Sequence, residues 1–161
     1  MQLTKESEYA LLGLAALAAS PTGEVTPLSK IVDDHGLPAS FLAKIFQKLA
    51  RHGLLTATRG PRSGYFLARS ADAITLRTIL ESVEGPQLFE HCLLLPGHGD
   101  HNPCSLHHYM EPILAALIAK LESITLAEYA ASLDNGRSAL PGPTPSPVDS
   151  HNTRSGPSEE L

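Results

Sequence analysis

The residues whose side chains are best suited to metal or redox chemistry lie close together in the second half of the chain. Two thiols and two imidazoles follow the pattern Cys-x5-His-x5-Cys-x2-His, at Cys92, His98, Cys104 and His107. These are the only two cysteines in 161 residues, and five of the eight histidines fall between positions 91 and 108. Thiolate and imidazole together suit zinc, copper or an iron–sulfur cluster. The spacing therefore predicts a metal or redox site in a loop that leads into a helix.

Spacing alone leaves three uses of these residues open. Cys92 and Cys104 can hold a 2Fe–2S cluster together with non-cysteine ligands. Two cysteines and two histidines can also form a tetrahedral site for zinc or a single iron. In the third case no metal binds, and the cysteines form a reversible disulfide or are inert. Because Cys104 and His107 lie three residues apart at an expected helix start, both can face one site.

Charge is distributed unevenly along the chain. Residues 1–72 carry eight basic and six acidic residues, a balance of +2, whereas residues 73–161 carry four and eleven, a balance of −7. Five basic residues and no acidic one lie between positions 44 and 62, namely Lys44, Lys48, Arg51, Arg59 and Arg62. A local basic stretch in an acidic protein indicates a surface for a polyanion, although a solvated helix face would look the same.

Composition also bears on location and on the class of protein. No apolar run reaches the roughly 18 residues of a membrane span. The apolar residues 10–19 lack the basic flank of a signal peptide, because Lys5 is offset by Glu6 and Glu8. We expect a cytoplasmic protein without membrane contact, in which the two cysteines are ligands or redox groups rather than a structural disulfide. Because no nucleophile triad, phosphate loop or carboxylate pair is apparent, we do not expect an enzyme.

Capping residues, helix breakers and apolar spacing predict the helices and strands that precede the Cys/His loop. Helices are expected over residues 4–19, 26–36 and 38–53, and strands over 54–58 and 65–68 around a tip from Gly60 to Gly64. Expected buried residues are Leu3, Ala10, Leu11, Leu14 and Leu17 in the first helix, and Leu42, Ile45, Phe46 and Leu49 in the third. Three helices followed by a hairpin predict a mainly α fold with a small β-hairpin wing, the winged helix-turn-helix.

The second half adds a helix over residues 75–84, a long helix over 105–123 and a short one that begins at a Thr125/Glu128 capping box. The long helix carries Ile113, Leu114, Leu117, Ile118 and Leu121, and we expect it to be a dimerisation helix, with packing onto its own domain as the alternative. The expected divisions are 1–85 for the DNA-binding domain, 86–104 for the Cys/His loop, 105–134 for the dimerisation and terminal helices, and 135–161 for a disordered tail.

Short motifs in a fixed order carry a family resemblance over residues 1–132. They are Leu3-Thr4, Glu8-Tyr9-Ala10, Ser40-Phe41-Leu42, Leu49, Gly53-Leu54, Arg59-Gly60, Gly64-Tyr65, Leu67-Ala68, Val83-Glu84-Gly85, Cys92, Cys104 and Leu106-His107. In order and spacing they resemble the bacterial iron–sulfur-cluster regulators of the IscR and NsrR type. The resemblance implies a winged-helix domain and a long dimerisation helix that act as a homodimer on palindromic double-stranded DNA.

The resemblance also implies a 2Fe–2S cluster in the Cys/His loop. Better-known members of the family use three cysteines there, and Cys92 and Cys104 match the first and the third. His98 stands at the position of the middle cysteine. The non-cysteine ligand that the resemblance implies is either His107 or Glu8. The wing also departs from the family pattern, with Ser63 where glycine is usual.

These observations together predict a DNA-binding transcriptional regulator of the repressor kind, whose operator affinity is set by a redox-, iron- or nitric-oxide-responsive 2Fe–2S cluster. The alternatives are a winged-helix module with a structural zinc or a mononuclear iron, and a thiol-based redox switch. The residues expected at the DNA are Ser40, Phe41, Lys44, Gln47, Lys48 and Arg51 on the third helix, and Arg59 and Arg62 beside the wing tip.

Overall fold

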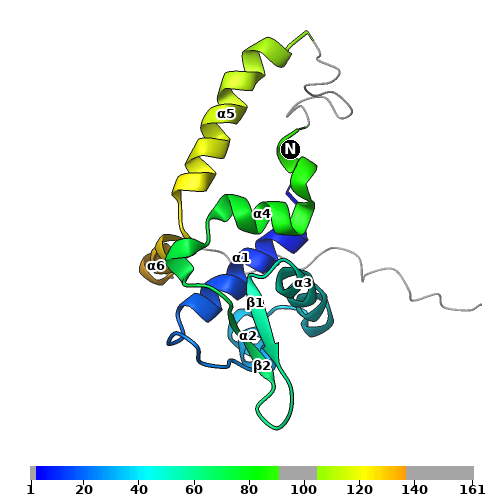
Figure 1. Cartoon of the computed structure of the whole chain (residues 1–161), viewed down its shortest axis with the longest axis vertical. Helices are drawn as coiled ribbons and strands as arrows, with labels where there is room; N and C mark the ends of the chain where they lie inside the picture. The colour runs from blue at the N-terminus through cyan, green and yellow to red at the C-terminus, as the bar shows by residue number, and fades with distance from the viewer. Residues whose placement is uncertain (1–2, 91–104, 137–161) are drawn as a thin grey trace, which may run out of the picture.

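The computed structural model describes residues 3–90 and 105–136 (Figure 1). Its elements are α1 (Lys5–Ala18), α2 (Leu28–His35), α3 (Ala39–Arg51), β1 (Leu55–Thr58), β2 (Gly64–Leu67), the 3-10 helix η1 (Ala71–Ala73), α4 (Leu76–Glu84), the 3-10 helix η2 (Pro86–Phe89), α5 (His107–Ser123) and α6 (Leu126–Gly136). The prediction of a mainly helical fold with a two-stranded wing is confirmed. In the described parts of the chain, no helix is both long enough and apolar enough to cross a membrane.

The core forms around α1, which packs against α3, α4 and α6. The four apolar positions expected on α3 are all at most 2% exposed, and Leu14 of α1 is fully buried. Helices α1 and α3 approach closely at Gly13, where a Cβ atom would lie 2.6 Å from Cε1 of Phe46. The expectation for Leu3 was wrong. It is 48% exposed because α1 begins only at Lys5, so the helical spacing does not extend to it.

The wing is an antiparallel hairpin that is tied to the start of α2. Leu55 pairs with Leu67, and Thr58 pairs with Gly64. A further bridge joins Thr26 and Tyr65, whose backbone N–H groups each donate to the other's carbonyl oxygen at 2.9 Å. The backbone of Thr26 is used in this bridge, and α2 begins at Leu28, two residues after the expected bound of 26, with Pro27 at its N-cap. The wing is therefore fixed to the helix-turn-helix and not only to its own strands.

Side-chain caps begin two helices of the second half, at position 75, where a helix was expected to start, and at the expected Thr125/Glu128 capping box. The Thr75 hydroxyl accepts from the amide of Thr78 at the start of α4. In the capping box of α6, the amide of Glu128 donates to the Thr125 hydroxyl at 3.2 Å, and the Glu128 carboxylate accepts from the amide of Thr125 at 2.8 Å. Helix α6 then returns to the winged domain, where Leu126 is fully buried. It continues to Gly136, two residues beyond the boundary expected at 134.

Helix α5 projects from the winged domain (Figure 1), and the residues that pack onto that domain lie in its half from Leu114 onward. Its Leu114, Ile118 and Leu121 contact a small cluster of buried residues formed by Leu80, Leu88 and Phe89. No residue of α5 is fully buried. Three large apolar side chains at or near its first half are exposed, Leu106 by 42%, Tyr109 by 69% and Ile113 by 55%.

Candidate functional site

Helix α3 separates its residues into a buried apolar face and an exposed polar face. Ser40, Lys44, Gln47 and Arg51 are all exposed, and their spacing of three or four residues places them on one side of the helix. Within the described residues, neither Lys44 nor Arg51 takes part in an ion pair. The polar face of α3 therefore presents two unneutralised cations and two hydrogen-bonding side chains to solvent.

The tip of the wing carries two more exposed cations. Arg59 and Arg62 lie between the ends of β1 and β2, and both are exposed. The tip is held by hydrogen bonds from the Thr58 hydroxyl to the carbonyl of Arg62 at 3.2 Å and from the amide of Ser63 to the carbonyl of Gly60 at 3.1 Å. These bonds limit the freedom of the turn, so the two arginines extend from an ordered hairpin.

Two residues of the expected DNA-contacting set are engaged within the fold instead. Phe41 is half-buried, and its ring meets the edge of Tyr9 with centroids 5.6 Å apart. The ammonium group of Lys48 donates a hydrogen bond to the carbonyl of Val83 at the end of α4, and it lies 3.6 Å from the carboxylate of Glu6. The exposed candidates on α3 are therefore Ser40, Lys44, Gln47 and Arg51, while a DNA contact by Phe41 or Lys48 stays a prediction.

The carboxylate of Glu84 lies next to Lys48 and is held by several hydrogen bonds, and the sequence did not identify it as a functional group. One oxygen of Glu84 accepts from the hydroxyl of Ser7 at 2.5 Å, from the amide of Thr4 at 2.8 Å and from the hydroxyl of Thr4 at 2.7 Å. Burial alone would raise the pKa of Glu84, but the hydrogen bonds from Ser7 and Thr4, helped by the charge of Lys48, hold it below its usual range. The motif Val83-Glu84-Gly85 was the only sequence signal for this group.

The expected sensor residues are only partly within the described structure. Cys92, His98 and Cys104 lie outside the described residues, whereas His107 is the first residue of α5. Glu8 is exposed on α1, and its carboxylate pairs with the ammonium of Lys5 at 2.6 Å. Among the residues that the structure describes, no three His, Cys, Asp or Glu side chains come together as a metal site would require. The donor types fit a mixed thiolate, imidazole and carboxylate site.

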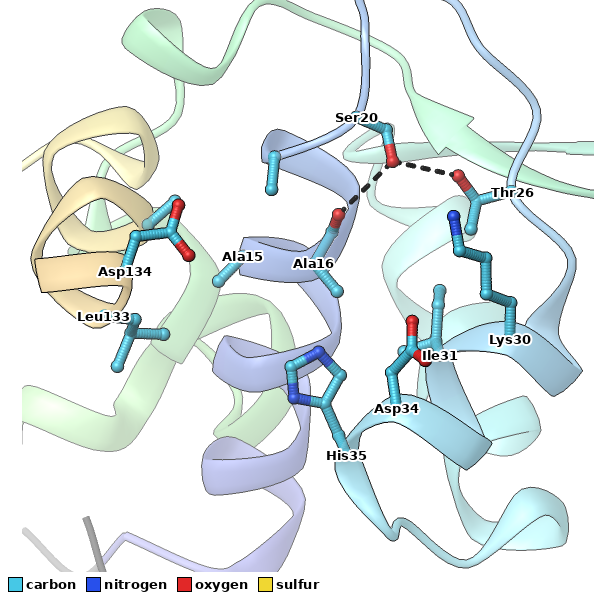
Figure 2. A pocket seen from close by; sticks show the side chains of 12 residues that line it. Ala15, Ala16, Ser20, Thr26, Lys30, Ile31, Asp34, His35, Leu133 and Asp134 are labelled. Atoms are coloured by element: carbon cyan, nitrogen blue, oxygen red, sulfur yellow. Dashed lines mark hydrogen bonds between the residues drawn. The ribbon is translucent and has the colours of Figure 1, made fainter. Parts of the chain in front are cut away.

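A cavity of about 210 Å³ lies elsewhere, between α1, α2 and α6 (Figure 2). Lys30 and Asp34 of α2 and Asp134 of α6 line it, and all three are exposed to solvent. Near its rim, the hydroxyls of Ser20 and Thr26 lie 3.3 Å apart. The cavity contains none of the residues expected to bind DNA or metal, so it is separate from both candidate sites.

A helix-turn-helix with an ordered basic wing and an exposed polar recognition helix defines the class of winged-helix DNA-binding proteins. A model of the Rrf2 family, described as iron-dependent transcriptional regulators, matches residues 3–132. The chain belongs to the Rrf2 family. It is also 35% identical over 108 residues to an HTH-type transcriptional regulator of Aquifex aeolicus (strain VF5). The matched region covers 65% of this chain and 74% of the relative. The class and the family agree that the protein is a transcriptional regulator.

Solved structures of similar fold include the regulators CymR and IscR. CymR (YrzC), named the global cysteine regulator of B. subtilis, superposes with a TM-score of 0.68 at 25% identity, covering 82% of this chain and 98% of that one. The oxidized form of Staphylococcus aureus CymR gives 0.65 at 22% identity, with 81% and 96% covered. T. potens IscR gives 0.60 at 21% identity, with 88% and 93% covered. The last two likenesses concern the fold alone.

Proposed function

We propose that the chain is a homodimeric repressor that binds palindromic double-stranded DNA and whose operator affinity depends on a 2Fe–2S cluster held by the Cys/His loop. The observation that carries the DNA-binding part is the exposed, unneutralised polar face of α3 beside an ordered basic wing. Burial fixes the opposite face of α3 in the core, so only this polar face is available to enter a major groove.

The polar face of α3 offers side chains for both base and phosphate contacts. Lys44 and Gln47 lie near its middle, where they would meet base edges, and each good bidentate contact contributes about 1–3 kcal/mol of discrimination. Arg51 at the end of α3, and Arg59 and Arg62 at the wing, would neutralise phosphates. Each such contact makes operator affinity more dependent on salt, because it releases a bound counterion.

Dimerisation would use the projecting part of α5. Leu106, Tyr109 and Ile113 expose apolar surface there, and none of the three packs against the buried clusters of the described residues. A second copy that packed on this surface by two-fold symmetry would remove it from water and would place two α3 helices on half-sites about one helical turn apart, or a multiple of it. The symmetry of the dimer would then require a palindromic operator.

The proposed cluster ligands are Cys92 and Cys104, with His107 as the next and His98 or Glu8 as the last. Two thiolates with imidazole or carboxylate form a donor set of the mixed kind that 2Fe–2S centres accept. Glu8 is exposed, so it is accessible either to its own chain's loop or to that of a partner subunit. When bound, the cluster supplies reversible one-electron chemistry and sensitivity to iron supply and nitric oxide.

A thiol-based switch is the second candidate, favoured by the likeness to CymR, of which one matched structure is an oxidized form. The chain has two cysteines, enough for one reversible disulfide.

The test that separates the cluster from its alternatives is to load the protein anaerobically and to quantify iron and acid-labile sulfide. The proposal predicts both elements and a visible chromophore that Cys92→Ala or Cys104→Ala abolishes and His108→Ala retains. Zinc without sulfide would indicate a structural site, and metal-free protein with a reducible disulfide would indicate the thiol switch.

A further inference from the structure

Three elements meet at the C-terminal end of α4, and Lys48 is the residue that joins them. Its ammonium reaches from α3 to the carbonyl of Val83 on α4 and to the carboxylate of Glu6 on α1. The last four carbonyls of a helix have no partner within the helix, and Val83 provides one of them. Lys48 therefore satisfies an orphan acceptor and lies at the negative end of the α4 dipole, which favours a cation there.

The next residue, Glu84, fastens the same end of α4 to the start of α1. Three donors from Thr4 and Ser7 converge on one of its oxygens, and Ser7 is only 1% exposed. The chain then turns at Gly85, whose φ of 101° suits glycine, and enters η2, which is the described first part of the segment 86–104 that was assigned to the Cys/His loop. Lys48 and Glu84 thus anchor the point where the loop segment leaves the winged domain.

We propose that Lys48 and Glu84 are positioning residues that couple the Cys/His loop to the recognition helix α3, and that Lys48 serves as this anchor rather than as a phosphate contact. The coupling role rests on the proposed function, in which the state of the loop sets DNA affinity. A displacement of the end of α4 moves the carbonyl and the carboxylate to which α3 and α1 are tied. The contacts with Val83 and Glu6 occupy donors of the Lys48 ammonium within the fold, so fewer of its three N–H groups are left for a phosphate.

This arrangement gives Lys48 a role different from that of Lys44 on the same helix. Lys44 lies one helical turn earlier, is exposed and makes no ion pair within the described residues. The pair of lysines therefore provides a matched comparison between a residue without an ion pair in the described residues and one that contacts α4 and α1. Glu84→Gln keeps the shape and the acceptor oxygen of Glu84 while removing its charge.

The experiment compares the wild-type protein with Lys48→Gln, Lys48→Arg, Glu84→Gln and Lys44→Gln. Operator affinity is measured with and without the reconstituted cofactor, across a salt series, on a duplex that the protein has selected from a random-sequence pool. The ratio of the two affinities should be about five-fold or more in the wild type. In Lys48→Gln and Glu84→Gln this affinity ratio should fall toward one while the salt slope stays unchanged. Lys48→Arg should recover part of the wild-type ratio. Lys44→Gln should keep the ratio and lower the slope by about one unit.

A second readout separates this inference from the proposed function. Hydrogen exchange of the α3 amides in the cofactor-free protein should become faster in Glu84→Gln and Lys48→Gln but not in Lys44→Gln. If Lys48→Gln lowers the salt slope by about one unit and keeps the ratio, Lys48 is a phosphate contact and the inference is wrong. A wild-type ratio of one would overturn the sensing function and the coupling with it. Unchanged α3 exchange would overturn the positioning role, even if the wild-type ratio confirms the sensing function.

Discussion

Replacing Gly64 by alanine tests how the wing is held against the helix-turn-helix. A Cβ atom at this buried position would lie 2.5 Å from the carbonyl oxygen of Thr26 and 2.8 Å from its carbonyl carbon. Both are backbone atoms, so no side-chain rotation can relieve the clash. The wing would have to move away, and the two hydrogen bonds between Thr26 and Tyr65, each 2.9 Å long, would break or lengthen.

The expected cost follows from those two bonds. A hydrogen bond contributes about 0.5–1.5 kcal/mol net, so losing both costs about 1–3 kcal/mol. Replacing glycine within a strand would otherwise stabilise the chain by about 0.5–1 kcal/mol, because alanine loses less backbone entropy. In the middle of each range the hydrogen-bond loss is the larger effect, and Gly64→Ala should lower the free energy of unfolding by about 1 kcal/mol and by no more than about 2.5 kcal/mol.

Urea unfolding followed by circular dichroism measures this difference, and the NMR amide signals of Thr26 and Tyr65 report on the bridge itself. Ser63→Ala is the control, because its side chain is exposed and next to Gly64 in the chain. The control should unfold like the wild type. A Gly64→Ala protein as stable as the wild type, with both amides still protected from exchange, would refute the close packing of the wing on Thr26.

Three further predictions concern DNA, assembly and pH. Arg59→Ala should weaken operator binding and lower the salt slope by about one unit at unchanged stability, and an unchanged slope would exclude a phosphate contact by the wing. Combining Tyr109→Glu with Ile113→Glu on the exposed part of α5 should convert a dimer into a monomer in sedimentation, and a dimeric variant would place the interface elsewhere. Because the pKa of Glu84 is lowered in the folded protein, its ionised form contributes stability above its unfolded pKa that is lost as pH falls through the folded value. The stability difference between wild type and Glu84→Gln should therefore shrink on acidification, and a pH-independent difference would contradict this.

The features that the sequence predicted well depend on interactions between residues that are close together in the sequence. Apolar residues at helical spacing identified the buried face of α3, because a helix that packs on a core must present one face to it. Thr75 and the Thr125/Glu128 pair marked helix starts, since their side chains bond to amides three residues away. Gly36 and Gly53, both with positive φ, marked helix ends.

The features that sequence missed depend on partners far along the chain. Thr4 does occupy the N-cap of α1, but its hydroxyl bonds to Glu84, eighty residues away, rather than to its own helix. Lys48 looks like one more cation in a basic stretch until α4 brings the Val83 carbonyl to it. The segment after Gly85 reads as part of a loop, yet it forms η2, which buries Leu88 and Phe89 against α4 and α5. No local pattern encodes such contacts.

The candidate sensor site is a prediction from residue types and spacing. Ligand types and spacing nominate Cys92, His98, Cys104 and His107, and only the last lies within the described residues. Chemistry can be inferred from residue types because thiolate and imidazole have known metal preferences. The distances among ligands depend on the three-dimensional arrangement of the residues that carry them, which spacing does not determine.

The most direct test of the central claim is a titration of operator DNA with the cluster-loaded, the reduced and the cofactor-free protein at one salt concentration. If the Cys/His loop sets DNA affinity, these forms should differ by about five-fold or more in dissociation constant. The same series with Cys104→Ala should give one affinity throughout. Equal affinities for all forms of the wild-type protein would contradict the account and leave a winged-helix DNA-binding protein without a sensor.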